Sequence, residues 1–88
     1  MIHRYTVHLS SVGNPDFGQD SEKPFSPPAT ATVRWLMDAK LACAGYIRRW
    51  DLGGGNWTGG QVYDAAGRHV ADISYNGRLW PPRLREAA

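Results

Sequence analysis

Cysteine and long apolar runs are both scarce in this chain. Cys43 is the single cysteine among the 88 residues, so no disulfide can form within the chain, and a reducing compartment is expected. No run of about 18 apolar residues occurs, which predicts that no helix spans a membrane. The first residues also lack an apolar segment of signal-peptide length. We therefore expect a cytoplasmic protein that has no membrane partner.

The net charge of the chain is also small. Ten Lys and Arg residues stand against eight Asp and Glu residues, which gives a formal net charge of +2 and a pI near 9.0. Such a mild excess does not by itself identify a nucleic-acid-binding protein. The length is that of one domain, so residues 1–88 are expected to fold as a single unit.

Glycine and proline are plentiful, with ten and six residues, and they favour many turns and hence strands. Residues 2–9 alternate between apolar and polar side chains, which predicts a half-buried strand. Residues 11–28 contain turn signals and four prolines, and we interpret them as a long surface loop. Phe17 and Phe25 are expected to attach this loop to the rest of the domain.

One segment shows helical periodicity. Its apolar side chains form a single stripe, and Gly53 suits the end of a helix. These features predict a helix over about 33–51. Residues 29–35 also alternate well enough for a short strand, so the start of the helix stays open. The stripe consists of Leu36, Ala39, Cys43, Tyr46, Ile47 and Trp50.

The last third of the chain predicts a meander. Residues 65–67 predict a three-residue loop with Gly67 in the left-handed conformation. Asn76-Gly77 predicts a two-residue type I′ turn, in which both residues have a positive φ. The three strands cover residues 61–64, 68–75 and 78–80, and residues 83–88 are expected to form a frayed tail.

This register decides which side chains share a face. It places Val62 opposite Val70, and Ile73 opposite Trp80. The face expected to pack on the helix carries Tyr63, Ala71, Ile73, Tyr75 and Trp80. The expected fold is α+β, with a three- to four-stranded antiparallel sheet, one helix packed on one face, and the order β-α-β-β-β. The first strand is expected at an edge of the meander.

Motifs for catalysis and metal binding are missing. The glycine-rich residues 53–60 follow a helix rather than open one, so they do not form a phosphate-binding loop. No serine has the context of a nucleophile. We therefore expect no enzyme, no catalytic residue, no metal and no cofactor. The residues considered as zinc ligands, which lack zinc-ligand spacing, are His3, His8, His69 and Cys43.

Arginines next to tryptophans recur along the chain and give the candidate binding site. Such neighbours are common in protein interfaces, and they can also hold single-stranded nucleic acid. Trp57 belongs to no periodic apolar pattern that would place it in the core. The sequence favours two roles for it about equally, an anchor in an interface and a side chain that fills the core. Trp50 and Trp80 are expected in the core. The candidate binding residues are Trp57, Asn56, Arg48, Arg49 and Arg78.

Two sequence patterns in this chain resemble those of small proteins from phages and mobile elements. They are Leu36-x-x-Ala39-x-x-x-Cys43-x-x-Tyr46-Ile47 and Gly67-x-x-Val70-Ala71-x-Ile73-x-Tyr75-Asn76-Gly77-Arg78-Leu79-Trp80. In size and element order over residues 36–80, the chain is most similar to the type I anti-CRISPR proteins, inhibitors of bacterial CRISPR–Cas surveillance complexes. The resemblance implies a non-enzymatic, phage-encoded inhibitor that binds this protein complex in the bacterial cytoplasm and blocks its function. It assigns no contact residue, and a small nucleic-acid-binding module is the alternative.

Overall fold

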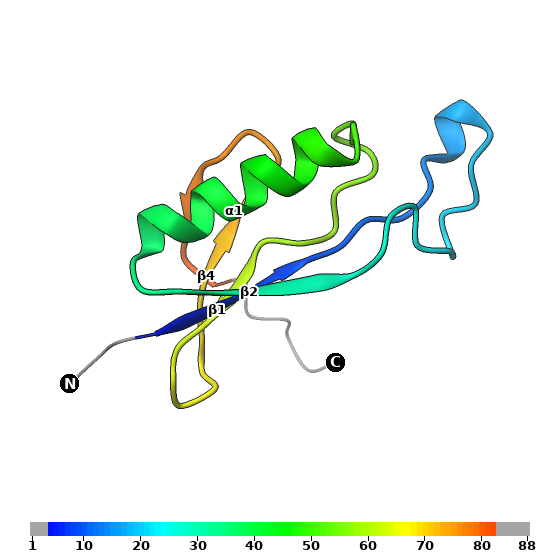
Figure 1. The fold of residues 1–88 in the computed structure, drawn as a ribbon. Helices are drawn as coiled ribbons and strands as arrows, with labels where there is room; N and C mark the ends of the chain where they lie inside the picture. Colours follow the sequence, from blue (N-terminus) through cyan, green and yellow to red (C-terminus); the bar gives the residue numbers. More distant parts are fainter. Residues whose placement is uncertain (1–3, 83–88) are drawn as a thin grey trace.

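The computed structural model describes residues 4–82 and has an α+β fold (Figure 1). The expected class is confirmed, with one helix on an antiparallel sheet that has five strands in the order β2-β1-β3-β4-β5. The predicted tail at 83–88 lies outside the described residues. The elements are β1 (Tyr5–Leu9), the 3-10 helix η1 (Pro15–Phe17), β2 (Ala29–Val33), α1 (Leu36–Arg49), β3 (Gln61–Tyr63), β4 (His69–Ile73) and β5 (Leu79–Trp80).

The segment before the helix is a strand. Residues Ala29–Val33 pair antiparallel with β1, from Leu9 opposite Ala29 to Tyr5 opposite Val33. Alternating Ala, Thr and Val residues favour the pleated conformation, because β-branched side chains pack well on a sheet. The helix therefore begins at Leu36, three residues later than predicted. β1 pairs with β3 at the edge of the meander, as expected, and β2 extends the sheet beyond β1.

The core lies between α1 and one face of the sheet (Figure 1). The centre of the predicted helical stripe is confirmed, because Ala39, Cys43 and Tyr46 are the buried residues of α1. They pack against side chains from three strands and the segment after the helix. These partners are Val7, Leu9, Leu52, Val62, Ala71 and Ile73.

The turn between β4 and β5 differs from the predicted type I′ turn. Gly77 has a φ of 84°, but Asn76 is not among the residues with positive φ. The Ser74 N–H donates to the Arg78 carbonyl at 3.0 Å, which closes a three-residue loop. The Arg78 N–H in turn donates to Ser74 Oγ at 3.2 Å, and this bond stabilises the wider loop.

The register of the meander is therefore shifted. Leu79 lies opposite Ile73, and Trp80 lies opposite Asp72. The loop at 65–67 has the predicted form, with Gly67 at a φ of 82°. Between β3 and β4, however, the pairs are Val62 with Ala71 and Tyr63 with His69, which leaves Val70 as the extra residue of a β-bulge.

These shifts correct the predicted core face. Ala71 and Ile73 pack under the helix as expected, but Val62 joins them. Tyr63 and Trp80 lie on the opposite face with their partners His69 and Asp72. Trp80 is 45% exposed, so its predicted place in the core is wrong.

Residues 10–28 extend the β1–β2 hairpin past the end of α1 (Figure 1). Phe17 and Phe25 do not attach this segment to the body, because they are 76% and 43% exposed. Buried hydroxyl groups do so instead. Ser26 Oγ bonds to Ser11 Oγ and, at 2.6 Å, to the hydroxyl of Tyr46, which also donates to the Pro27 carbonyl at 2.7 Å.

Candidate binding site

The sheet face opposite α1 is covered by no helix within residues 4–82 (Figure 1). We call it the open face. Strand alternation and the observed pairs place polar and aromatic side chains from four strands on it. Its central residues are Thr6, His8, Gln61, Tyr63, His69, Asp72 and Trp80.

A row of rings crosses the middle of the open face. The ring of Tyr63 lies 4.9 Å from that of His8 and 5.2 Å from that of His69, measured between centroids. Three strands, β1, β3 and β4, supply the three rings. Such a row presents flat surfaces and hydrogen-bonding groups side by side, a combination suited to recognition.

A histidine–carboxylate pair ends this row. Nε2 of His69 lies 2.8 Å from Asp72 Oδ1 and 3.0 Å from the Ala71 carbonyl oxygen. Because both neighbours accept hydrogen bonds, Nε2 carries the proton. Residues three apart on a regular strand point to opposite faces. The bulge at Val70 removes this alternation and brings His69 and Asp72 together.

A groove of about 920 Å³ runs from this pair to the glycine-rich segment. Trp57, Tyr75 and Trp80 are among the large side chains that line it, together with Tyr63, His69 and Asp72. Tyr75 and Trp80 are 43% and 45% exposed. The Tyr75 hydroxyl donates to the Leu52 carbonyl at 3.0 Å, which fixes the β4–β5 turn against the segment that follows the helix.

Of the predicted binding residues, Trp57 lines the groove and is also anchored to the core. Its Nε1–H donates to the Ile73 carbonyl at 3.1 Å, and its ring centroid lies 6.2 Å from that of Tyr46. Asn56 is 5% exposed. Its amide donates to the Val12 carbonyl at 2.9 Å and its Oδ1 accepts from the Gly53 N–H at 3.0 Å, so Asn56 stabilises the loop.

The predicted arginines lie elsewhere. Arg48 and Arg49 are exposed in the last turn of α1, where the Arg49 guanidinium lies 5.3 Å from the ring of Trp50. Arg78 is exposed in the β4–β5 turn. None of the three is among the residues that line the groove. The five residues therefore do not form one site, and the role of each in binding remains a prediction.

Sequence reasoning missed the residues of the open face. It considered His8 and His69 as zinc ligands rather than as binding residues, and it placed Tyr63 and Trp80 under the helix. Strand alternation around Val7 already put His8 outside the core, and this signal was available. Within residues 4–82, no three His, Cys, Asp or Glu side chains gather in a way that could hold a metal ion.

The buried thiol offers no nucleophile. Burial raises the pKa of Cys43 to about 12, so the thiol is protonated at neutral pH. The side chains of the open face offer aromatic rings, hydroxyl groups, one amide and one carboxylate, and these groups are suited to binding a partner rather than to nucleophilic chemistry.

None of the helices formed by residues 4–82 has the length and apolar character that a bilayer crossing requires. In comparisons with known proteins, the chain matches no family model, no curated protein and no solved structure.

Proposed function

We propose that this chain is a non-enzymatic binding protein whose partner is another protein, held on the open face. One observation carries the proposal: a sheet face that no helix of residues 4–82 covers presents Trp80 and Tyr63 beside a groove of about 920 Å³. Tyr and Trp are enriched in the energetically important centres of protein interfaces. Trp80 is 45% exposed, so its ring is accessible to a partner.

The distribution of charge favours a protein over a nucleic acid. Phosphate contacts require arginines or lysines gathered on one face. Here Arg48 and Arg49 lie on the helix, and Arg68 pairs with Asp64 at 3.2 Å in a turn. The middle of the open face carries the carboxyl group of Asp72 instead.

A nucleic-acid-binding module remains the second candidate, because rings such as those of His8, Tyr63 and His69 can stack on bases. Salt separates the two candidates. A nucleic acid would lose affinity steeply as salt rises, whereas a protein partner would lose less.

A narrower form of the proposal follows from the resemblance to type I anti-CRISPR proteins, namely inhibition of a host defence complex. Expression of the chain in bacteria with an active type I CRISPR–Cas system tests it. Restored transformation by a targeted plasmid supports this form, and unchanged interference excludes it for that system.

The main experiment uses affinity capture from a bacterial lysate, followed by binding measurements with the purified partner. Trp80→Ala should weaken binding about 30-fold, the equivalent of about 2 kcal/mol. Met37→Ala is the matched control, since it also removes an exposed apolar side chain, 62% exposed, but from the helix. Equal affinity of the Trp80→Ala variant and the original chain would refute the proposal.

A further inference from the structure

The two edges of the sheet are protected very differently. β5 has two residues and is followed at once by Pro81 and Pro82, which lack the N–H that an added strand would need. β2 has five residues, Ala29–Val33, without a charge or a proline. It pairs with β1 on one side only, and no described strand pairs with its other side.

The hydrogen bonds of β1 show which groups of β2 point outward. The His8 carbonyl accepts from the Gly60 N–H at 2.7 Å, so His8 directs its main chain toward β3. Neighbouring residues of a strand direct these groups to opposite sides, so Val7 bonds toward β2, to its partner Ala31. Thr30 and Thr32 therefore direct their N–H and C=O groups away from the sheet.

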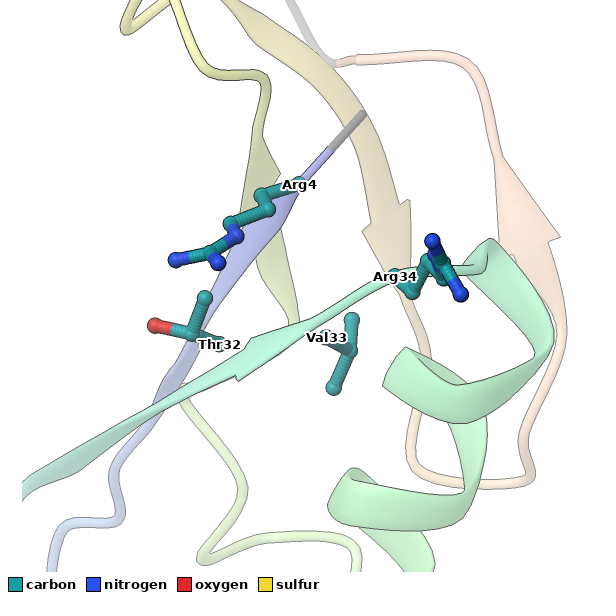
Figure 2. A pocket seen from close by; sticks show the side chains of 4 residues that line it. All are labelled: Arg4, Thr32, Val33 and Arg34. Atoms are coloured by element: carbon teal, nitrogen blue, oxygen red, sulfur yellow. The ribbon is translucent and has the colours of Figure 1, made fainter. Parts of the chain in front are cut away.

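A cavity of about 450 Å³ lies at one end of this edge. It is lined by Arg4, Thr32, Val33 and Arg34 (Figure 2). Figure 2 shows Arg4 reaching over Thr32 on one side of the strand, while Val33 points to the other side and Arg34 lies near the first turn of α1.

The charges around this cavity are all positive. Arg4 and Arg34 are exposed, and neither has an ion pair with another residue of the described range. The Arg34 guanidinium lies over the ring of Trp35, 5.9 Å from its centroid. Two positive charges thus flank a strand edge that offers unpaired main-chain donors and acceptors.

We propose that the β2 edge binds an extended, acidic segment of a protein partner as a sixth strand. The outward groups of Thr30 and Thr32 would form the main-chain ladder, and a Glu or Asp side chain would lie between Arg4 and Arg34. A second copy of this chain fits less well, because its own β2 has no carboxylate to offer these arginines. The inference rests on the proposed function in that it takes the partner to be a protein.

NMR titration of the ¹⁵N-labelled protein tests this inference without knowledge of the partner. One probe is a short synthetic peptide of alternating valine and threonine with two glutamates at one end. The control peptide has lysines in place of the glutamates. The glutamate peptide should shift the amide signals of Thr30, Thr32 and Arg34, and should bind about fivefold more tightly than the control, or better.

Variants of the protein distinguish strand addition at the β2 edge from simple attraction of the peptide to a positively charged patch. Thr32→Pro removes an outward N–H and should abolish the shifts, whereas Thr32→Val keeps the N–H and should preserve them. Arg34→Glu should reverse the preference between the two peptides.

The inference is overturned if millimolar glutamate peptide leaves the β2 signals unchanged, or shifts the open face instead. It is also overturned if sedimentation shows a dimer that Thr32→Pro dissolves, since the occupant is then a second copy. Trp80→Ala should leave peptide binding unchanged. If the peptide does not bind but partner binding depends on Trp80, only the proposal for the β2 edge is refuted. If the peptide binds as expected but partner binding does not depend on Trp80, only the proposal for the open face is refuted.

Discussion

Replacing Trp57 with alanine tests whether the glycine-rich segment belongs to the core or is an independent interface loop. The indole donates to the Ile73 carbonyl at 3.1 Å and packs near the ring of Tyr46. The main chain of Trp57 also forms a bridge with Ser11. The substitution therefore removes one hydrogen bond to β4 and one aromatic contact with the helix.

The expected loss of stability follows from these contacts. Truncation of a fully buried Trp to Ala costs about 3–5 kcal/mol. Trp57 is half-buried, which reduces the packing loss to about 2 kcal/mol, and a carbonyl left without its donor adds about 1 kcal/mol. The sum of about 3 kcal/mol is more than half the stability of a domain with about 5 kcal/mol. The melting temperature should fall by about 10–20 °C.

Urea unfolding followed by circular dichroism measures this loss. Trp57→Phe is the control, because it keeps an aromatic ring but removes the donor and part of the indole, and it should cost about 1–2 kcal/mol, less than Trp57→Ala. If Trp57→Ala unfolds at the same urea concentration as the original chain, the core role is refuted. A loss of partner affinity of about 2 kcal/mol in that folded variant would then identify Trp57 as an interface anchor.

Three further predictions concern buried or bonded groups. Because burial raises the pKa of Cys43 to about 12, a thiol reagent should label the native protein far more slowly than the denatured protein at pH 8, and equal rates would contradict the burial. The Arg68 N–H, which donates to Asp64 at 2.9 Å, lowers the pKa of Asp64 below 3.8. The folded state thus favours the carboxylate, so stability should fall as the pH drops below 3.8, and Asp64→Asn should reduce this fall in melting temperature. Tyr46→Phe removes the hydroxyl that bonds Ser26 and Pro27, and should cost about 1–2 kcal/mol. It should also speed amide exchange in residues 11–26, and unchanged exchange would show that the network does not hold the hairpin.

The helix and the fold class were predictable because their signals are local and repeated. The stripe through Ala39, Cys43 and Tyr46 repeats at the helical period, and all three are buried. The strand at Ala29–Val33 was not settled by the sequence. Its five residues alternate but carry little apolar surface, and their pairing with β1 depends on a hairpin whose connection is long.

The wide loop between β4 and β5 had a signal that was overlooked. Residues 64–68 and 74–78 share a pattern, in which an Asp or Ser is followed three residues later by Gly and four residues later by Arg. In both loops the side-chain oxygen of the first residue accepts from the N–H of the last, at 2.9 Å for Asp64 and 3.2 Å for Ser74. This shared bond favours the three-residue loop over the turn that Asn76-Gly77 would form alone.

The histidine–carboxylate pair had no such signal. Strand alternation places His69 and Asp72 on opposite faces, and only the bulge at Val70 brings them within 2.8 Å. The place of a bulge depends on how two strands pack on the core, which no local pattern of β4 reveals.

Side-chain volume explains which face of the meander packs under the helix. The buried positions of α1 include Ala39 and Cys43, and small side chains there let the helix approach the sheet closely. Val62, Ala71 and Ile73 fit beneath such a helix, whereas a tryptophan would force it away. The large rings of Tyr63 and Trp80 therefore lie on the other face. The tight packing that stabilises the fold thus also leaves aromatic surface exposed, and this surface is what the proposed partner would cover.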